Sequence, residues 1–394
     1  MKRLLGATAL GLASSVLLGA AAMADDFHGF DPANYNGAML SADQLKAMVA
    51  DAMKAAPPKN GTSYVFGFAN LQRDIPFGVE VEKGIQQNAD AAGLSLQIAD
   101  NRLDGPTALA NAQSFAQRNV DFVIEFQTDV NFGPQVMKIF NDASIKVIAI
   151  DIPMPGATFF GANNPKSGFM GGSYLADAAV AKFGTDKVAQ GYFVDGELPQ
   201  SGAIPAMRTE GQIAGFQAVL PTFPADHIIK FDSKNTMQES FTQMSNVIGR
   251  IPQGVPIMGI GINDQVALGI LRAVKQAGRD ADLVDVGNGA DETKALVDEP
   301  NLVAATGYFP ERYGNFLIPM ALETLAGKTL PPAVLMTHYM ISKSNVCNYY
   351  PAFKCGTDNP AVTYTFPQDA FAKWLGTLSS EPALKGYETL IPKA

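Results

Sequence analysis

The stretch GIGINDQVALGILRAVKQAG, residues 259–278, connects a strand-like segment to a helical one through three polar side chains. The apolar run that precedes it, residues 255–262, has the length and composition of a buried strand. Helical spacing of apolar residues begins directly after Asn263, Asp264 and Gln265. Polar residues at such a junction cap the helix, hold a ligand or catalyse a reaction, and the rest of the chain helps to separate these roles.

Strand-like and helical segments alternate along most of the chain. Segments 63–70, 120–126 and 146–152 are strand-like, and a segment with helical spacing follows each of them. The alternation starts again after residue 166 and continues to residue 309. Such alternation produces parallel sheets through right-handed crossovers. We therefore expect an α/β fold with two doubly wound parallel-sheet lobes, whose ligand sits beyond the carboxyl ends of the strands.

The predicted strand ends carry mostly carboxylates, amides and an aromatic ring. In chain order they include Gln127, Asp129, Asp151, Asp195, Glu197, Asp232, Asn263, Asp264, Asn288 and Tyr308. A carboxylate accepts hydrogen bonds from hydroxyl groups, an amide both donates and accepts, and a ring covers an apolar face. The set suits a small, neutral, hydroxyl-rich ligand, although loop solvation alone also places polar residues at strand ends.

The first 24 residues have the pattern of an export signal. Lys2 and Arg3 precede an apolar stretch, and residues 22–24, Ala-Met-Ala, form a small-x-small cleavage site before Asp25. A membrane anchor is the alternative, but the Gly- and Ala-rich composition and the cleavage site favour removal. Loss of Lys2 and Arg3 changes the formal net charge from −9 to −11, and so acidic a surface argues against nucleic-acid binding. We expect an exported, soluble periplasmic protein.

The chain has only two cysteines, Cys347 and Cys355, in the segment CNYYPAFKC. An exported chain folds in an oxidising compartment, where a disulfide that closes this loop is expected. Two free thiols are the alternative. The spacing excludes a catalytic CxxC pair.

The segment INDQVALGILRAV, residues 262–274, resembles a signature of periplasmic sugar-binding proteins of the ribose-binding type. These proteins are the solute receptors of ABC importers, and the resemblance spans residues 62–342. It implies two lobes that are joined by a three-strand hinge and close on the ligand. It also implies that Asn263 hydrogen-bonds ligand hydroxyls, while Asp264 caps the following helix.

The resemblance implies further ligand-binding residues. Phe77 in the Pro-Phe pair is expected to stack on a sugar ring, but the second aromatic of the family is replaced by Gly78. Asp151 matches a ligand-binding Asp, but the Arg that often follows it is replaced by Ile152. The loss of that Arg indicates fewer hydrogen bonds there, or a smaller or deoxygenated substituent on the ligand.

The remaining candidates match the family less closely. Arg208 resembles a ligand-binding Arg but lies four residues, or one helical turn, earlier than usual, with Gln212 at the usual place. Asn288 stands where the family usually has Asp, and Tyr308 where it often has Gln. The other candidates are Asp74, Gln127 and Phe231.

The expected domains follow from this resemblance. They are a signal peptide (1–24), a leader (25–61), an N-terminal lobe (62–164 plus 309–340) and a C-terminal lobe (165–308 plus 341–394) that carries the Cys347–Cys355 loop.

We expect a periplasmic receptor that binds a monosaccharide or a related small polyhydroxylated ligand and delivers it to an ABC transporter permease. A non-sugar ligand, such as a nucleoside, a polyol or a signalling furanone, is the alternative. His28, His227 and His338 have no metal-ligand spacing, and no phosphate loop or catalytic serine elbow is present, so we expect no enzyme, metal or cofactor. A DNA-binding regulator would need a basic helix-turn-helix where the export signal stands. A monomer is the default for a soluble receptor.

Overall fold

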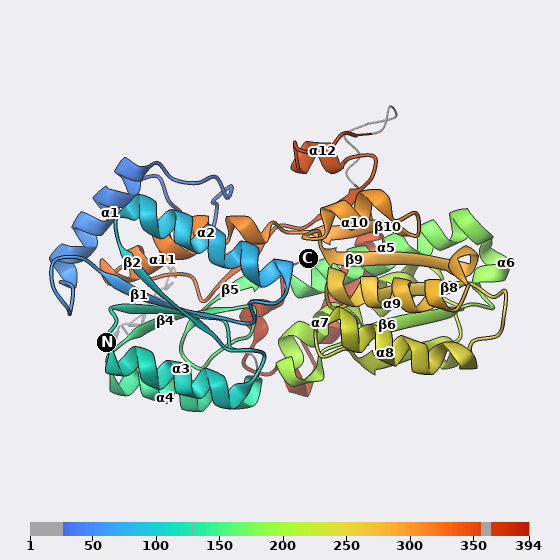
Figure 1. The fold of residues 1–394 in the computed structure, drawn as a ribbon, viewed down its shortest axis with the longest axis horizontal. Coiled ribbons are helices and arrows are strands. Elements are labelled where there is room, and N and C mark those ends of the chain that lie inside the picture. The colour runs from blue at the N-terminus through green and yellow to red at the C-terminus, as the bar shows by residue number, and fades with distance from the viewer. Residues whose placement is uncertain (1–26, 128, 356–363, 394) are drawn as a thin grey trace, which may run out of the picture.

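The computed structural model of the chain describes residues 27–127, 129–355 and 364–393. Within these residues, two sheets of six strands each form the centres of two lobes (Figure 1). The α/β fold with two parallel-sheet lobes that the sequence predicts is therefore confirmed. The expected export signal, residues 1–24, lies outside the described residues.

The first sheet has the strand order β11-β5-β4-β3-β1-β2, and its neighbouring strands are parallel. Its strands are β1 (Val65–Asn70), β2 (Ser95–Asp100), β3 (Phe122–Glu125), β4 (Lys146–Ile150), β5 (Thr158–Ala162) and β11 (Ala333–Met336). Crossover helices cover both faces of a parallel sheet, which is why the inner strands β1, β3, β4 and β5 are buried on both sides. The helices are α2 (Pro76–Ala92) and α11 (Gly314–Leu325) on one face, and α3 (Gly105–Gln117) and α4 (Gly133–Asp142) on the other (Figure 1).

The leader before the first strand folds onto this lobe. Its helix α1 (Ala42–Ala55) begins with a capping box, in which Ser41 Oγ accepts from Gln44 N and Gln44 Oε1 accepts from Ser41 N. The buried face of α1 includes Leu45 and Met48 and packs against α11 and α2. The leader therefore contributes to the core of the first lobe.

The second sheet has the strand order β12-β10-β9-β8-β6-β7, in which β12 is antiparallel to β10 and the other neighbours are parallel. Its strands are β6 (Tyr192–Glu197), β7 (Ile228–Asp232), β8 (Ile257–Gly261), β9 (Leu283–Gly289), β10 (Leu302–Gly307) and β12 (Tyr339–Ser342). One face is covered by α5 (Asn164–Phe183) and α7 (Ala203–Val219), and the other by α8 (Met237–Val247), α9 (Asp264–Gln276) and α10 (Thr293–Asp298). The short helix α6 (Thr185–Val188) follows α5.

Three crossings connect the lobes, as the sequence predicts. They run from β5 to α5 through Asn163, from β10 towards α11 through Tyr308, and from β11 to β12 through His338. His338 touches the other two crossings, because its Nε2 accepts from Asn163 N at 2.9 Å and its ring lies 4.8 Å from that of Tyr308. Burial lowers the pKa of His338 well below its usual range, and the positive charges of Arg208 and Lys166 lower it further, so this hinge contact involves a neutral ring.

The two lobes of the expected domain division differ from the structure in two places. Strand β12 begins at Tyr339, which pairs with Gly307 in the second sheet, two residues before the expected boundary at residue 341. The C-terminal segment was expected in the second lobe alone, but it contacts both. Its helix α13 (Gln368–Leu378) packs against α5 and α7, while η8 (Glu388–Leu390) contacts β11 of the first sheet.

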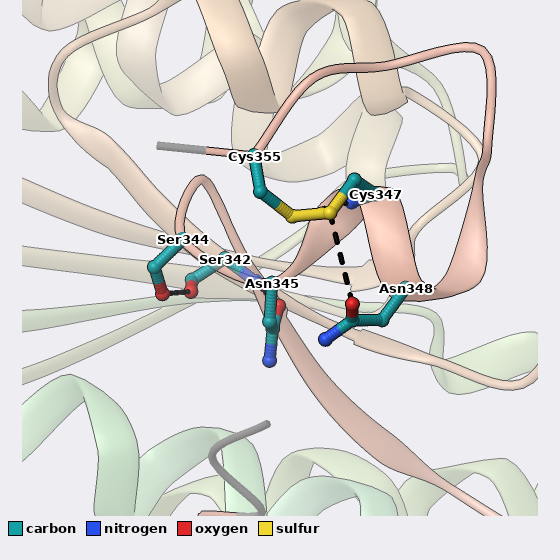
Figure 2. The surroundings of a disulfide bond; sticks show 6 residues. All are labelled: Ser342, Ser344, Asn345, Cys347, Asn348 and Cys355. Atoms are coloured by element: carbon teal, nitrogen blue, oxygen red, sulfur yellow. Dashed lines mark hydrogen bonds between the residues drawn. A yellow bond between two sulfur atoms is a disulfide. The ribbon is translucent and has the colours of Figure 1, made fainter. Parts of the chain in front are cut away.

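The two cysteines lie on an arm at the edge of the second lobe, which carries the short helix α12 (Val346–Tyr349) (Figure 1). Val346, Tyr349 and Tyr350 of the arm pack against the apolar core of that lobe. A disulfide joins Cys347 to Cys355, with the two Cα atoms 5.1 Å apart (Figure 2). The arm is anchored at its base by Asn345, whose Oδ1 accepts from Ser342 N at 2.8 Å and whose Nδ2 donates to Met340 O at 3.0 Å.

None of the described helices combines the length and the hydropathy that crossing a bilayer requires.

Candidate functional site

A cavity lies between the lobes, at the carboxyl ends of both sets of parallel strands. Its volume is about 60 Å³. The first lobe contributes Leu71, Ile75, Phe77, Phe126, Asp151 and Ile152 to its wall. The second lobe contributes Leu198, Ser201, Pro205, Arg208, Asn235, Ile262 and Asn263, and the crossing after β10 contributes Tyr308. Mostly apolar walls with a few convergent polar groups are typical of a small-molecule site.

Phe77 lies in the first turn of α2, which Pro76 starts with its restricted φ angle. Its buried ring packs edge-on against Phe126, with centroids 6.1 Å apart, and lies 5.8 Å from the ring of Tyr308. These three rings all line the cavity. The aromatic surface that the sequence predicts at Phe77 is therefore shared with a hinge residue.

Asp151 follows β4 in the left-handed backbone region, with φ 53°. Its Oδ1 accepts from Ala162 N at 2.6 Å, and its Oδ2 accepts from Tyr313 OH at 3.2 Å. A Cβ atom on Gly161 would lie 2.1 Å from Asp151 Oδ1, so only glycine fits at that position. Burial raises the pKa of Asp151, while the charge of Arg208 and the two hydrogen bonds lower it.

Arg208 reaches the cavity from α7, although its place in the sequence is one helical turn earlier than the family pattern. Its Nε donates to Asn164 Oδ1 at 3.0 Å, and its Nη1 donates to Ile262 O at 2.6 Å. Its guanidinium carbon lies 5.7 Å from the centroid of the Tyr308 ring. Within the described residues, its Nη2 has no hydrogen-bond partner, so this donor remains for a ligand.

The helix cap that the sequence predicts at Asp264 is made by Asn263 instead. Asn263 caps α9, because its Oδ1 accepts from Val266 N at 2.8 Å. Asp264 is the first residue of the helix, and its Oδ2 accepts from Glu292 N at 3.1 Å. Gln265 is buried and donates to Glu292 Oε1.

The amide of Asn263 also belongs to a chain of hydrogen bonds that crosses the cleft. Its Nδ2 donates to Asn235 Oδ1 at 2.8 Å, and Asn235 Nδ2 donates to Gln72 Oε1 of the first lobe at 2.9 Å. Asn263 therefore lines the cavity, starts a helix and supports a contact between the lobes.

The periplasmic binding protein domain family matches residues 66–329 of the chain, which is most of the two lobes. The chain belongs to the periplasmic binding protein family. It is 28% identical over 265 residues to the ribose import binding protein of Escherichia coli, a match that covers 64% of this chain and 82% of the relative. This agrees with the resemblance to ribose-type binding proteins and with a receptor rather than an enzyme.

Solved structures of binding proteins share the fold. An ABC transporter solute-binding protein from Mycobacterium smegmatis, with bound glycerol, has a TM-score of 0.61 and 21% identity, over 76% of this chain and 99% of that one. The Caulobacter myo-inositol binding protein has a TM-score of 0.61 and 22% identity, over 74% of this chain and 97% of that one. At these identities the likeness establishes the fold.

Four of the residues predicted to bind ligand in this binding protein lie outside the cavity wall. Asn288 is buried behind it, where its Oδ1 accepts from Ser167 Oγ at 2.6 Å and from Thr306 Oγ1. Phe231 belongs to the apolar core beside α9. Gln127 is buried, and its Oε1 accepts from Asp129 N at 2.7 Å.

Asp74, the fourth of them, lies at the mouth of the cleft in a separate hollow of about 490 Å³. Its Oδ1 accepts from Gln72 Nε2 at 2.8 Å. Gln72 is the residue that Asn235 contacts from the second lobe. Asp74 therefore orients a contact between the lobes instead of facing the cavity.

The sequence did not single out Ser201 and Asn235, although both line the cavity. Ser201 ends the 3-10 helix η2 (Pro199–Ser201), four residues after strand β6, and Asn235 follows strand β7 by three residues. Both positions lie beyond the strand ends, in loops whose path the strand pattern does not predict. Their polar character after a strand was the available signal, and it is too common to identify a site.

We expect Asn263→Ala to weaken ligand binding about tenfold and to lower the free energy of unfolding by about 1 kcal/mol, because the change removes a helix cap and the contact with Asn235. Titration calorimetry and thermal melting measure the two effects. Asn263→Asp is the matched variant, since it keeps the cap acceptor and replaces the donor to Asn235 with a carboxylate oxygen. Binding by Asn263→Ala equal to that of the wild type would contradict the expected role.

Proposed function

We propose that this binding protein is an exported periplasmic receptor that closes on a monosaccharide or a related small polyhydroxylated ligand and delivers it to an ABC transporter permease. The observation that best supports this proposal is a set of hydrogen-bonding groups on the cavity wall that lack partners. Ser201 Oγ is buried without a partner, and Arg208 Nη2 and Tyr308 OH have none within the described residues. Ligand hydroxyls would supply the partners that these groups lack.

Contacts between the lobes support a receptor that closes around its ligand. Asn235 donates to Gln72 across the cleft, and Gln200 Nε2 donates to Leu103 O at 3.3 Å. Such contacts exist only when the lobes are close together, so they favour the closed form. A ligand that binds both walls shifts the population towards this form, which is how binding proteins of two lobes signal occupancy.

Other features fit an extracytoplasmic receptor. The signal-like first 24 residues would direct export, and the disulfide between Cys347 and Cys355 would form in the oxidising periplasm. We take the receptor to be monomeric, because the ligand cavity is complete within one chain. The solved neighbours with glycerol and myo-inositol support a polyhydroxylated ligand for the same fold.

A thermal-shift screen of residues 25–394 tests this proposal. The panel contains pentoses, hexoses, polyols and nucleosides, with amino acids as controls. A ligand at 100 times its Kd should raise the free energy of unfolding by about 2.7 kcal/mol. Stabilisation by a sugar or polyol is expected. Stabilisation by nucleosides alone would move the protein to the non-sugar alternative, and stabilisation by amino acids alone would contradict the proposal.

A further inference from the structure

The two walls of the cavity differ in polarity. Five of the six side chains from the first lobe are apolar, and Asp151 is the exception. The second lobe contributes the polar side chains Ser201, Arg208, Asn235 and Asn263. A ligand that fills the cavity therefore meets hydrocarbon on one side and hydrogen-bonding groups on the other.

Much of the hydrogen-bonding capacity of the wall is already used by the protein. Asn235 and Asn263 bond to each other and to Gln72 and Val266. Each carboxylate oxygen of Asp151 already accepts one hydrogen bond from the first lobe. The wall can still offer the remaining lone pairs of Asp151 together with three groups that lack partners.

Two of these groups, Ser201 and Arg208, lie on the second-lobe side of the cavity, and the third, Tyr308, lies at the hinge, where its ring packs beside Phe77. Ser201 belongs to η2 and Arg208 to α7, which follows directly, and Tyr308 stands in the crossing that leaves β10. Arg208 and Tyr308 are neighbours, with 5.7 Å between the guanidinium carbon and the ring centroid. No comparable group with an unused donor faces them among the described residues of the first-lobe wall.

The size and charge of the cavity limit the ligand further. A cavity of about 60 Å³ leaves room for only a small ligand, since a single water already needs at least about 10–15 Å³. Asp151 and Arg208 contribute opposite charges from the two lobes. Because these charges partly balance each other, the cavity does not require a charged ligand. A compact and neutral ligand fits both observations.

We propose that the ligand is a small, neutral, partly deoxygenated polyol, such as a deoxy sugar or an alkyl diol. Its hydroxyl groups lie on the edge that faces Ser201, Arg208 and Tyr308, and a continuous hydrocarbon edge packs against the first-lobe wall. This inference rests on the proposed function and specifies its substrate class. Each additional hydroxyl that faced the apolar side chains of the first-lobe wall, away from Asp151, would lose its water without gaining a partner, which weakens binding roughly tenfold.

Titration calorimetry on residues 25–394 with matched pairs of compounds tests the inference. The pairs are 2-deoxyribose with ribose, fucose with galactose, rhamnose with mannose, and 1,2-butanediol with erythritol. In the pair that binds, the deoxygenated member should bind at least about tenfold more tightly. If that pair is a sugar pair, the ligand is a deoxy sugar, and if it is the pair of 1,2-butanediol and erythritol, the ligand is an alkyl diol. Tighter binding by the fully hydroxylated member would overturn the inference and leave the proposed function intact. No binding by any pair would overturn both.

Two variants of the apolar wall extend the test. Ile75 stands at the N-cap of α2 without a capping side chain, so Ile75→Asn adds a polar group where asparagine favours the fold. Ile152→Asn adds one beside Asp151, at a buried position. Both variants should shift the ratio of the two affinities within the binding pair at least fivefold towards the hydroxylated member.

Val79→Asn is the control, because Val79 is exposed on α2 and absent from the cavity wall. An unchanged preference in both wall variants, each melting as the wild type does, would contradict the inference.

Discussion

Arg208→Ala should weaken ligand binding about 100-fold, the largest loss that we expect from one side-chain change in the cavity. The guanidinium is buried and donates hydrogen bonds to Asn164 Oδ1 and Ile262 O through Nε and Nη1. Its Nη2, which has no partner within the described residues, remains for a ligand on the cavity wall. A hydrogen bond from a charged group contributes about 1.5–3 kcal/mol, and a 100-fold loss corresponds to about 2.7 kcal/mol. The buried Asp151 also loses the positive charge that lowers its pKa.

The loss of Arg208 should also change the pH dependence of binding. Without the positive charge, burial alone dominates, and the pKa of Asp151 rises further above its usual range. Asp151 then becomes protonated at a higher pH, and binding that uses its carboxylate is lost at a higher pH than in the wild type. Calorimetry across a pH series measures both the affinity and this shift.

Arg272→Ala is the matched control, because Arg272 is exposed on α9 and absent from the cavity wall. It should bind ligand as the wild type does. Arg208→Lys keeps the charge but not the forked geometry, and should recover only part of the affinity. If Arg208→Ala binds within threefold of the wild type, Arg208 has no direct role in holding the ligand.

The sequence predicts the fold well because the signals of that fold are local. Alternation of apolar strands with amphipathic helices indicates a parallel sheet, and the break after residue 166 indicates two of them. The C-terminal segment shows where this reasoning stops. Its apolar residues, such as Phe371 and Leu375, predict burial but not the partner, and η8 in fact reaches β11 of the first lobe.

The candidate site was only partly predictable, because strand ends specify position along the chain but not the direction of a side chain. Asn263 and Asp264 are adjacent and both suit a helix cap, so their roles depend on packing against Asn235 and Glu292. Asn288 stands at a strand end, but its oxygen is used by Ser167 from α5. Such tertiary partners leave no trace in the spacing of one sequence.

Gly172→Ala should lower the free energy of unfolding by about 3 kcal/mol, at the upper end of the usual cost of overpacking. A Cβ atom on Gly172 would lie 1.8 Å from the backbone oxygen of Gln212, and one on Gly168 would lie 1.9 Å from that of Arg208. Backbone atoms cannot rotate away as a side chain does, so α5 and α7 must move apart. Thermal melting measures the effect.

The same substitution should weaken ligand binding, because α7 carries Arg208. That residue and Gln212 both tie α7 to the end of β8, through Ile262 O at 2.6 Å and Gly261 O at 2.8 Å. If α7 is displaced, these two bonds lengthen and the guanidinium leaves its position on the cavity wall. A loss of affinity at a temperature where Gly172→Ala is still folded would show that the close contact of two helices positions the binding group.

Gly376→Ala provides the matched control for this helix contact. Gly376 also lies inside a helix, α13, but a Cβ atom there meets nothing within 4 Å. Alanine is the better helix former, so this variant should gain about 0.5–1 kcal/mol of stability and bind ligand as the wild type does. The stability changes of Gly172→Ala and Gly376→Ala have opposite signs because the new methyl group meets a neighbouring backbone in the first variant and open space in the second. If both variants melt alike, the close approach of α5 and α7 is not what holds Arg208 at the cavity.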